Sequence, residues 1–586
     1  MLLKLIITIL SFTVALLHKI ISPGSITYCN QPVVSLLTAY VSLQRQDEIF
    51  VRDFGAVPGD GKDDSQTILS AIEYAKIHKV RKVSFDRGIY EFKTLSGWEE
   101  KGRKPSCYIS LHDISNLELS GAVDTQGKPA TQWVKHNDLK ECQPMILSIE
   151  QGTNITVQNI AVDMAPYYYS AGKVVTVQGD KITIKVLDGH PRTDGQKAYI
   201  MGVYDLEAHK AKVVRITWDT NLPQWHMTGR EKDRQMTMHY TPLAQSCKAG
   251  DGVFWFQGNY DGALLHFGNI NTLLLKNVTI LNGHGFPVTC EFCHDVVYTN
   301  VSIKPEGNRI ATTCRDGLKI FCGSGKLLMD GVHIEGCLGD DGQNIHGIWL
   351  SVLRKQPGNS LFTTTSMPCL TPGKAVVLLD NQFHPAWRSK VESCTIVGKE
   401  MQIIFSNPIP DWVQEKTPIE PQEWLPDSVH IVNSVYRSTG RFGILLKSSN
   451  TLIENCLFEN NVAAIHIGGE WSWDYWLEST NSQHVEIRNC TFRDNHLDMR
   501  FGGKKMDVAI NVASWTNPGK LGEPSEILSG LVLDLRIHDN LFENESVCVN
   551  LQNCGNVWFW NNTLKNCGKD LMINEKTAQN VFRSAH

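Results

Sequence analysis

The amino-acid sequence predicts an all-β fold, a parallel β-helix with a helix at its N-terminal end and two inserted antiparallel β-barrel-like domains. Short alternating strand motifs recur after a corner residue, 23 residues apart between Asn277 and Asn300 and 22 residues apart between Asn540 and Asn562. This period is typical of solenoids, in which each coil buries one face against the next. A helical pattern precedes the repeats, and two long segments interrupt them.

The helical pattern predicts a helix that begins near Ser65. Asp63 and Gln66 resemble a variant capping box at its start. The pair Asp63 and Asp64 is therefore expected to stabilise the helix N-terminus rather than to form a second acidic site. Four apolar residues recur at helical spacing: Ile68, Leu69, Ile72 and Ala75.

The two interruptions predict inserted domains. Residues 173–186 read KVVTVQGDKITIKV, which alternates strictly on both sides of a turn and indicates a hairpin. Residues 375–379 and 401–405 read as strands in a second segment without a coil period. We expect the following organisation: β-helix over 48–162, 259–347 and 428–575, and insertions over 163–258 and 348–427.

Composition and the N-terminus bound the class of protein. The chain has 586 residues, 42% hydrophobic content and a net charge of −5, which suits a large buried core and gives no indication of nucleic-acid binding. Residues 1–25 combine Lys4, an apolar run over 5–17, and Pro23-Gly24. This pattern is typical of a signal peptide, and the run is short for a retained membrane anchor. We expect a secreted protein, or one in the lumen of the secretory or lysosomal pathway, with no membrane association after cleavage.

Cysteines and sequons fit that compartment. The sequence has 16 cysteines, some of which are expected to pair as disulfides, although their connectivity cannot be deduced. The lone CxxC at Cys290 and Cys293 indicates core thiols or a disulfide rather than a metal site. Six Asn-x-Ser/Thr triplets indicate either glycans or coil corners followed by a strand: Asn154, Asn277, Asn300, Asn489, Asn544 and Asn561.

The main candidate site lies between Cys314 and Gly347. Asp316 and Asp340 are 24 residues apart, so that one coil would stack them as neighbours on one face. Asp340 and Asp341 point to opposite sides of a regular strand and share a cleft only if the backbone turns, which flanking glycines make easy.

Three adjacent carboxylates cannot all ionise freely, because repulsion raises at least one pKa. A protonated acid beside ionised bases is what an inverting glycosidase needs. The same Asp-Gly sequences are also ordinary turns at solenoid corners. Asn344 and His346 on the same short segment favour a site.

A second candidate feature is the aromatic segment between Glu470 and Glu478. Trp471, Trp473, Tyr475 and Trp476 alternate there with acidic residues, among them Asp474. Aromatic rings can stack on the apolar faces of a sugar while carboxylates bind its hydroxyls. A hydrophobic plug on the side of the solenoid would have the same composition.

Two resemblances follow from these motifs. The opening, DFGA followed by DGKDD, a helix and a strand, resembles the pectate-lyase-like superfamily of single-stranded right-handed β-helices, in which the helix caps the open end. The segments GDDGQNIHG, GRFGILLKSSNTLIENCLF and GGEWSWDYWLEST together resemble glycoside hydrolase family 110, the secreted α-1,3-galactosidases. The second resemblance spans roughly residues 53–567.

The family resemblance implies a set of roles. Asp340 would be the general acid, and Asp316 and Asp341 would hold and deprotonate the attacking water. The enzyme would invert the anomeric centre and release terminal α-1,3-linked galactose from blood-group-B-like or linear α-galactosides, without a metal or cofactor. A homo-oligomer is compatible with this reading. Residues expected to hold the sugar are Asn344, His346, Lys319, Arg441, Glu470, Trp473, Asp474 and Trp476.

Departures from the family pattern leave alternatives open. The resemblance would place a His near Lys319 and an Arg near Ser324. A polygalacturonase-like hydrolase would use the same aspartates with Arg315 and Lys319 on a uronic acid. A calcium-dependent polysaccharide lyase would bind the ion through clustered carboxylates and form an unsaturated product. The last alternative is a glycan-binding solenoid without turnover.

Overall fold

The computed structural model describes residues 47–96, 107–136, 144–217, 221–258, 262–364, 367–472, 476–501, 504–516 and 528–584. The predicted signal peptide, residues 1–25, lies outside these ranges. Residues Glu48–His586 form one compact unit. None of the helices within the described ranges combines the length and the apolar character that a membrane span requires.

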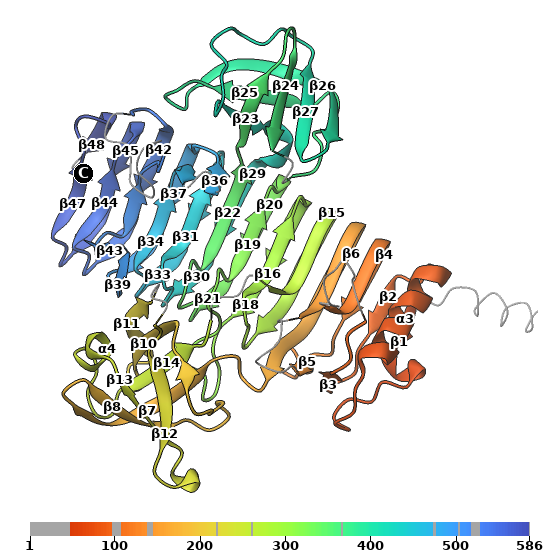
Figure 1. Cartoon of the computed structure of the whole chain (residues 1–586), viewed down its shortest axis with the longest axis vertical. Coiled ribbons are helices and arrows are strands. Elements are labelled where there is room, and N and C mark those ends of the chain that lie inside the picture. Colours follow the sequence, from red (N-terminus) through yellow and green to blue (C-terminus); the bar gives the residue numbers. More distant parts are fainter. Residues whose placement is uncertain are drawn as a thin grey trace, which may run out of the picture. The chain divides into compact units, whose positions relative to one another are not determined.

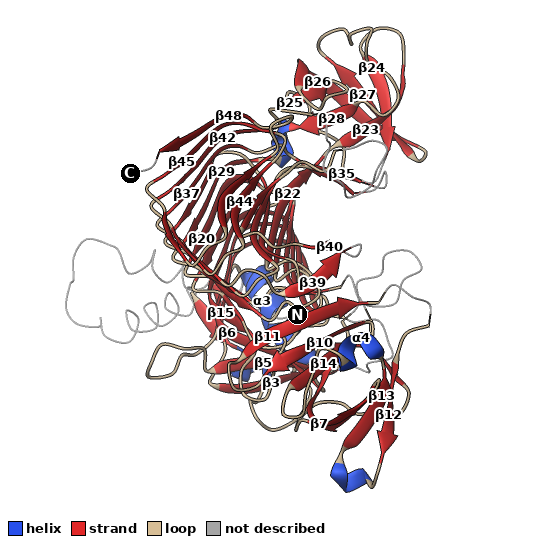
Figure 2. Ribbon diagram, turned by 90° about the vertical axis from the view of Figure 1, so that its left-hand side faces the viewer, coloured by secondary structure: helices blue, strands red, loops and turns tan. Residues whose placement is uncertain are grey.

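Most strands belong to one parallel β-helix, with three strands in each complete coil (Figures 1 and 2). The strands of successive coils pair in parallel and so build three faces. The first face consists of β15 (Ala263–Ile280), β16 (Phe286–Glu291), β19 (Leu318–Phe321), β22 (Gln343–Ile348), β31 (Phe442–Lys447), β34 (Ala463–Ile467), β41 (Ile510–Val512), β44 (Val547–Leu551) and β47 (Lys569–Ile573).

The other two faces run beside it. β15 is long and also pairs with the first strand of each of these faces. The second face consists of β17 (His294–Thr299), β20 (Ser324–Asp330), β29 (Pro426–Val432), β32 (Thr451–Glu454), β37 (Gln483–Arg488), β42 (Val532–His538), β45 (Cys554–Trp560) and β48 (Gln579–Ser584). The third face consists of β18 (Ser302–Ile303), β21 (His333–Glu335), β30 (Val435–Arg437), β33 (Leu457–Glu459), β38 (Thr491–Arg493), β43 (Leu541–Glu543) and β46 (Thr563–Lys565).

Alternating side chains fill the interior of the solenoid. Apolar residues from all three faces form one continuous core. Four aromatic rings of successive coils stack inside it, with centroid separations of 5.2, 5.1 and 4.7 Å: Tyr436, Phe458, Phe492 and Phe542.

Asparagines at the coil corners explain the repeated Asn in the sequence. Asn277 and Asn300 have φ of 53° and 54°, a left-handed conformation that Asn tolerates better than most residues. Asn300 Nδ2 donates to Asn277 Oδ1 of the preceding coil at 3.1 Å, and Asn277 Nδ2 donates to Asn159 Oδ1 at 2.8 Å. The Nδ2 atoms of all six sequon asparagines donate hydrogen bonds to another residue in this way.

The N-terminal part begins with a capping helix, α3 (Ser65–His78), after the 3-10 turn η1 (Val51–Phe54). The helix packs against β1, β2 and β4, and its side chains Ile68, Ala71, Ile72 and Ala75 are buried. Asp63 Oδ1 accepts hydrogen bonds from the Ser65 backbone N–H and hydroxyl at the helix start. Asp64, the N-cap residue, does not cap the helix with its side chain, contrary to the prediction, because its carboxylate accepts hydrogen bonds from the Val57 and Glu91 backbone N–H groups. The strands here are β1 (Glu48–Phe50), β2 (Lys82–Ser84), β3 (Gly88–Phe92), β4 (Cys107–Ser120), β5 (Thr131–His136) and β6 (Met145–Ala165).

The first insertion follows β6 and forms a sheet of ten antiparallel and parallel strands. Its first two strands are the predicted hairpin. Two strands from the C-terminal coils complete the sheet. The eight strands of the insertion are β7 (Ser170–Gln178), β8 (Lys181–Val186), β9 (Gln196–Lys197), β10 (Ile200–Asp205), β11 (Lys210–Ile216), β12 (Gln224–Thr228), β13 (Gln235–His239) and β14 (Gly252–Phe256), and it also contains η2 (Glu231–Asp233) and α4 (Thr241–Ala244). The two strands from the C-terminal coils are β39 (Asp498–Phe501) and β40 (Lys504–Lys505).

The second insertion lies between β22 and β29 and forms a closed barrel. Its strands are β23 (Leu350–Lys355), β24 (Ser360–Thr364), β25 (Ala375–Leu379), β26 (Pro385–Val397), β27 (Glu400–Phe405) and β28 (Pro418–Pro421), followed by η3 (Gln422–Trp424). A short hairpin, β35 (Glu470–Ser472) and β36 (Trp476–Ser479), follows β34. The predicted fold class, a β-helix with a capping helix and two inserted antiparallel domains, is confirmed.

The described cysteines are all free thiols. Cys290 and Cys293, the predicted CxxC, are both fully buried in the solenoid core. Burial raises the pKa of the Cys293 thiol well above its usual value. This environment is that of core thiols, one of the two readings that the sequence favoured.

Candidate active site

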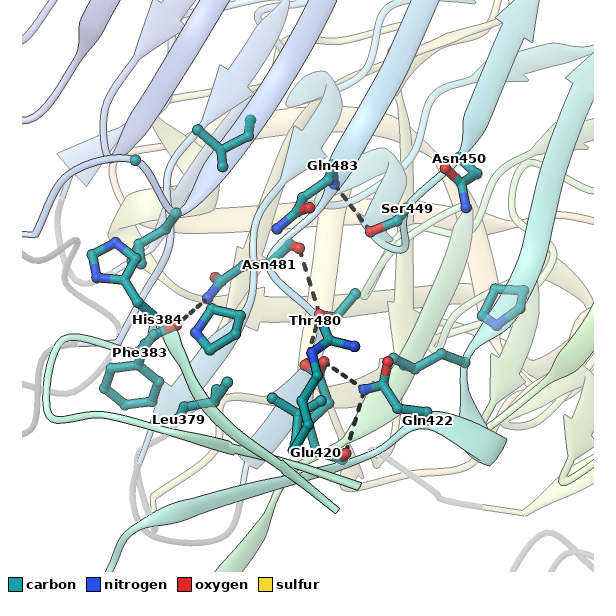
Figure 3. A pocket seen from close by; sticks show the side chains of 18 of the residues that line it. Leu379, Phe383, His384, Glu420, Gln422, Ser449, Asn450, Thr480, Asn481 and Gln483 are labelled. Carbon is teal, nitrogen blue, oxygen red and sulfur yellow. Dashed lines mark hydrogen bonds between the residues drawn. The ribbon is translucent and has the colours of Figure 1, made fainter. Parts of the chain in front are cut away.

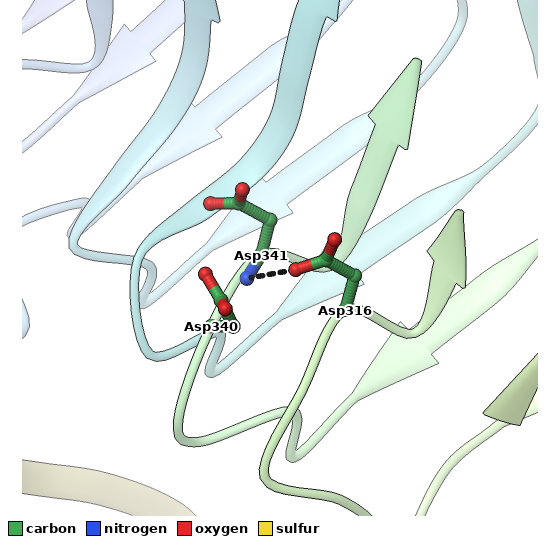
Figure 4. Close-up of side chains that lie close together, drawn as sticks. All are labelled: Asp316, Asp340 and Asp341. Atoms are coloured by element: carbon green, nitrogen blue, oxygen red, sulfur yellow. Dashed lines mark hydrogen bonds between the residues drawn. The ribbon is translucent and has the colours of Figure 1, made fainter. Parts of the chain in front are cut away.

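Three aspartates meet at the start of two neighbouring strands of the first face (Figure 4). Asp316 precedes β19, and Asp340 and Asp341 precede β22. These strands pair in parallel, with Lys319 beside Asn344. One carboxylate oxygen from each aspartate lies within 4.8 Å of the other two. The structure therefore brings together the carboxylates that the 24-residue spacing predicts to be neighbours.

Two glycines permit this approach for a different reason than the sequence suggested. Neither Gly339 nor Gly342 has a positive φ. A Cβ atom on Gly339 would lie 2.2 Å from the Cys314 carbonyl oxygen, and one on Gly342 would lie 2.6 Å from the Gly443 carbonyl oxygen. The adjacent coils come too close for any side chain, so that glycine is required by packing rather than by a left-handed turn.

Backbone and amide donors fix two of the three carboxylates. Asp316 Oδ1 accepts a hydrogen bond from the Asp341 backbone N–H, and its Oδ2 accepts one from Asn344 Nδ2, both at 3.3 Å. Asp341 Oδ1 accepts one from the Phe442 backbone N–H at 3.0 Å. Asp341 Oδ2 and Asn344 Oδ1 are buried and have no hydrogen-bond partner among the described residues. They are acceptors available to a hydroxyl or a water.

Cations surround the third carboxylate. Arg315 Nη1 lies 3.3 Å from Asp340 Oδ2, and Arg441 Nη1 lies 3.6 Å from Asp340 Oδ1 and 3.9 Å from Asp341 Oδ2. The Asp340 side chain is 20% exposed, whereas Asp316 and Asp341 are buried. Lys319 Nζ lies 4.9 Å from the centre of the Phe286 ring. Asp340 is thus the triad member that solvent and a substrate can reach.

Burial sets the proton affinity of the triad. It raises the pKa of Asp316 to about 7, with a further contribution from the negative charge of Asp340. Burial also raises the pKa of Asp341 well above its usual value, although Arg441 opposes the shift. Asp316 and Asp341 are therefore the carboxylates that favour a bound proton near neutral pH. The cluster can therefore both donate and accept a proton.

A buried ion cluster lies farther along the first face. Lys447, with 0% side-chain exposure, lies 3.2 Å from Glu470 and also binds Glu478. These carboxylates raise the pKa of Lys447 in spite of burial, and the surrounding positive charges hold the pKa of Glu478 well below its usual value in spite of burial. Glu470, predicted to bind the sugar, is thus engaged by Lys447 in this structure.

His346 faces this cluster as a neutral acceptor. Burial lowers its pKa to about 4. Its Nδ1 lies 2.8 Å from the Gly347 carbonyl oxygen, which can only accept, so that Nδ1 carries the proton. Nε2 is then an acceptor, 3.7 Å from Glu478 Oε1, and has no hydrogen-bond partner among the described residues. A ligand hydroxyl could donate to it.

The described tryptophans of the aromatic segment lie in two different environments, one buried and one at the surface. Trp471 is buried against Trp349 and Phe383, at centroid distances of 6.2 and 5.8 Å. Trp476 on β36 is 43% exposed and belongs to the surface. Trp473 and Asp474, both predicted to bind the sugar, lie outside the described residues.

Sequence reasoning missed Lys447 and His466 on the first face. Each interrupts an apolar run, in GILLKS and AAIHIGG, and this is the signal that could have found them. His466 Nδ1 accepts a hydrogen bond from Asn511 Nδ2 at 2.8 Å. Burial lowers the pKa of His466 well below its usual value. It stands beside Trp515 and Phe442, with ring centroids 4.5 and 4.8 Å away.

The triad also has the donor set for a metal ion, since hard cations such as Ca²⁺ bind carboxylate oxygens. Arg315 and Arg441 already supply positive charge to two of the three carboxylates. A cation would have to share Asp340 with both guanidinium groups. A chelator experiment is therefore informative for this site.

Comparison with known proteins gives one family model, "Right handed beta helix region", which matches residues 422–585. Among curated relatives, an alpha-1,3-galactosidase A of Akkermansia muciniphila is 27% identical over 232 residues, 38% of each chain. An alpha-1,3-galactosidase B of the same organism is 20% identical over 76% of this chain and 57% of its own. The alignments thus span less than two thirds of these two relatives. An alpha-1,3-galactosidase A of Bacteroides fragilis is 20% identical over 79% of this chain and 80% of its own.

Solved structures of related architecture are more distant. The A-module of mannuronan C-5 epimerase AlgE4 from Azotobacter vinelandii aligns with 92% of this chain and 100% of its own, at 12% identity and a TM-score of 0.40. A family 28 exopolygalacturonase of Yersinia enterocolitica aligns with 91% of this chain and 78% of its own, at 12% identity and a TM-score of 0.38. The chain is thus a right-handed parallel β-helix similar in sequence to several alpha-1,3-galactosidases.

Proposed function

We propose that this chain is a secreted glycoside hydrolase that removes terminal α-1,3-linked galactose from glycans. The observation that carries the proposal is the triad of Asp316, Asp340 and Asp341, whose oxygens approach within 4.8 Å beside two arginines. The names of the sequence relatives support the substrate. Carboxylates that share protons are the machinery of glycoside hydrolysis.

In the proposed reaction Asp340, the exposed triad member, protonates the glycosidic oxygen. Asp316 and Asp341 hold the attacking water and take its proton. The pKa shifts favour a resting proton on Asp316 or Asp341, so that it must pass to Asp340 within the triad when substrate binds. One oxygen of each carboxylate lies within 4.8 Å of the other two, a separation that a single bridging water can span to relay the proton.

Two features of the triad point to opposite stereochemical outcomes, retention and inversion of the anomeric centre. Inverting glycosidases usually hold their two carboxyl groups about 6.5–9.5 Å apart and retaining enzymes about 5–5.5 Å apart, and the present spacing is nearer the second value. These values apply to sites with two carboxyl groups, whereas this site has a third. A water with hydrogen bonds of about 2.7 Å to two oxygens bridges up to roughly 5.4 Å, so that Asp316 and Asp341 can share one. We therefore propose inversion.

The test is hydrolysis of α-1,3-, α-1,4- and α-1,6-galactobiose, with the released anomer followed by proton NMR. We expect galactose from the α-1,3 isomer alone, with the β-anomer appearing first. Early α-galactose would reject inversion but keep the hydrolase. No galactose from any isomer would reject the galactosidase.

A second candidate, hydrolysis of a uronic acid glycoside, has one observation in its favour. Lys319 forms no ion pair within the described ranges and lies at the triad, where it could bind a carboxylate. Release of galacturonate from digalacturonic acid would favour this candidate, and Lys319→Gln should abolish it. An unsaturated product that a chelator prevents would instead indicate the lyase.

A further inference from the structure

A cavity of about 400 Å³ lies between the closed barrel and the corner that joins the first and second faces (Figure 3). The barrel contributes β25, β26 and β28, and the solenoid contributes the segments that precede β32, β37 and β42. The volume is within the range of small-molecule sites, which form preferentially between domains. None of the triad residues lines it.

The cavity is separated from the triad by the length of a strand. Asp341 contacts the first residue of β31, Phe442, whereas the last, Lys447, accepts a hydrogen bond through its carbonyl oxygen from the backbone N–H of Thr480 in the cavity wall. Six residues of strand span about 17–20 Å. The buried ions around Lys447 occupy the intervening part of the face. A ligand in the cavity is therefore remote from the carboxylates that would cleave it.

The Glu420 carboxylate at the floor of the cavity already has hydrogen-bond partners within the protein. Glu420 accepts hydrogen bonds from Thr480 Oγ1 at 2.7 Å and from Gln422 Nε2 at 3.0 Å (Figure 3). It also accepts one from Trp349 Nε1 at 2.8 Å. Three donors disperse the charge of this buried carboxylate. The floor is thus suited neither to a metal ion nor to acid catalysis.

The walls and the rim supply different chemistry. Leu379 and Phe383 of the barrel provide an apolar wall on one side, and Ser449, Asn450 and Gln483 provide polar groups on the other (Figure 3). Leu531 and Leu533, at the start of β42, add apolar surface to the lining. An apolar wall opposite convergent amides and hydroxyls suits a ring with C–H faces and hydroxyl edges.

Charge at the rim indicates a neutral ligand. Arg388 lines the cavity, is exposed, and has no hydrogen-bond or ion-pair partner among the described residues. Asp427 lines it as well and carries the opposite charge. These two charges offset each other, and the remaining charged group of the lining, the Glu420 carboxylate, is already held by three hydrogen-bond donors, so that neither an anion nor a cation is favoured. We propose that this cavity binds a neutral saccharide, at a site separate from the carboxylate triad and independent of turnover.

The test uses the full chain and three neutral probes, D-galactose, D-glucose and N-acetyl-D-glucosamine, with D-galacturonate as the charged comparison. Binding is followed by saturation-transfer NMR and titration in the wild type, in the double variant Arg388→Ala/Gln483→Ala, and in Lys390→Ala. Lys390 is exposed on the same strand, does not line the cavity, and loses the same charge. Thermal midpoints of all variants confirm folding.

We expect at least one neutral probe to bind, with a Kd raised about tenfold or more in the double variant, since two hydrogen-bonding groups are lost. Lys390→Ala should bind as the wild type does. In an Asp341→Asn background the cavity component should persist, which separates it from any sugar at the triad. The proposal is overturned if no neutral probe binds, if only galacturonate binds, or if the double variant binds unchanged.

Discussion

Asp340 differs from the other triad residues in being partly exposed and in contacting two arginines, and this makes its role testable. Asp340→Asn should lower the rate on α-1,3-galactobiose by about 10²–10⁴-fold, as expected for loss of an acid. On 4-nitrophenyl α-galactoside the loss should be much smaller, because nitrophenolate leaves without a proton. Asp341→Asn should slow both substrates alike. Equal losses on the two substrates in Asp340→Asn would contradict the acid role.

The raised pKa of Asp316 makes stability depend on pH. The folded chain holds this proton up to about pH 7, whereas the ordinary value of 3.8 applies to the unfolded chain. Between these values the folded state binds more protons, so that stability decreases as pH rises. The difference is at most on the order of 4 kcal/mol. Wild-type thermal midpoints should therefore fall, relative to those of Asp316→Asn, from pH 4 to pH 7. Parallel curves for the two proteins would show that Asp316 is not the titrating group.

At the level of elements, the corner asparagines combine two effects that substitution can separate. Asn300 has a φ of 54° and donates to Asn277 in the preceding coil. Asn300→Gly keeps the backbone conformation and loses the hydrogen bond, which costs about 1 kcal/mol. Asn300→Ala loses the same hydrogen bond and also the short polar side chain by which Asn tolerates the left-handed conformation, which costs up to about 1–2 kcal/mol more. Thermal midpoints should decrease from wild type to Gly to Ala. An Ala variant as stable as the Gly variant would show that the conformation carries no penalty.

The same corners explain what the sequence could predict. Asn277 and Asn300 mark the period, and the period places Asp316 beside Asp340, because neighbouring coils are also neighbours in sequence. Arg441 was identified through the family resemblance, although it lies 101 positions after Asp340, most of them in the barrel insertion. The contact between Lys447 and Glu478 was not predicted from the sequence. Their contact depends on the hairpin of β35 and β36 folding back on β22, where Ser479 pairs with Gly347. The repeat period of the sequence does not indicate that this hairpin folds back on β22.

Across the whole unit from Glu48 to His586, long-range contacts connect the first insertion to the solenoid near the triad. Ile200 on β10 lies against Gly339, one residue before Asp340, and leaves no room there for a Cβ. Asn460 Nδ2 donates to the Ala211 carbonyl oxygen at 2.9 Å. The insertion thus supports the loop that positions two of the three carboxylates. In a solenoid each coil otherwise contacts only the coils next to it, so that a contact through the insertion links coils that are distant from each other.

One of these links depends on few interactions and can be broken selectively. β11 pairs with β39 through two residues only, and Arg215 reinforces the pair with hydrogen bonds of 2.8 Å to the Asp498 carbonyl oxygen and carboxylate. Arg215→Ala should increase amide hydrogen exchange in 210–216 and 498–501 together, because weak pairing opens both strands.

The loop that carries Asp340 should be unaffected in Arg215→Ala, since β14 also holds β10. Arg493→Ala, which removes ion pairs to Glu459 and Glu543 within the third face, is the control and should leave 210–216 unchanged. Faster exchange in 210–216 alone would show that β39 is held by its own coil, and that the insertion is attached to the solenoid by its other contacts.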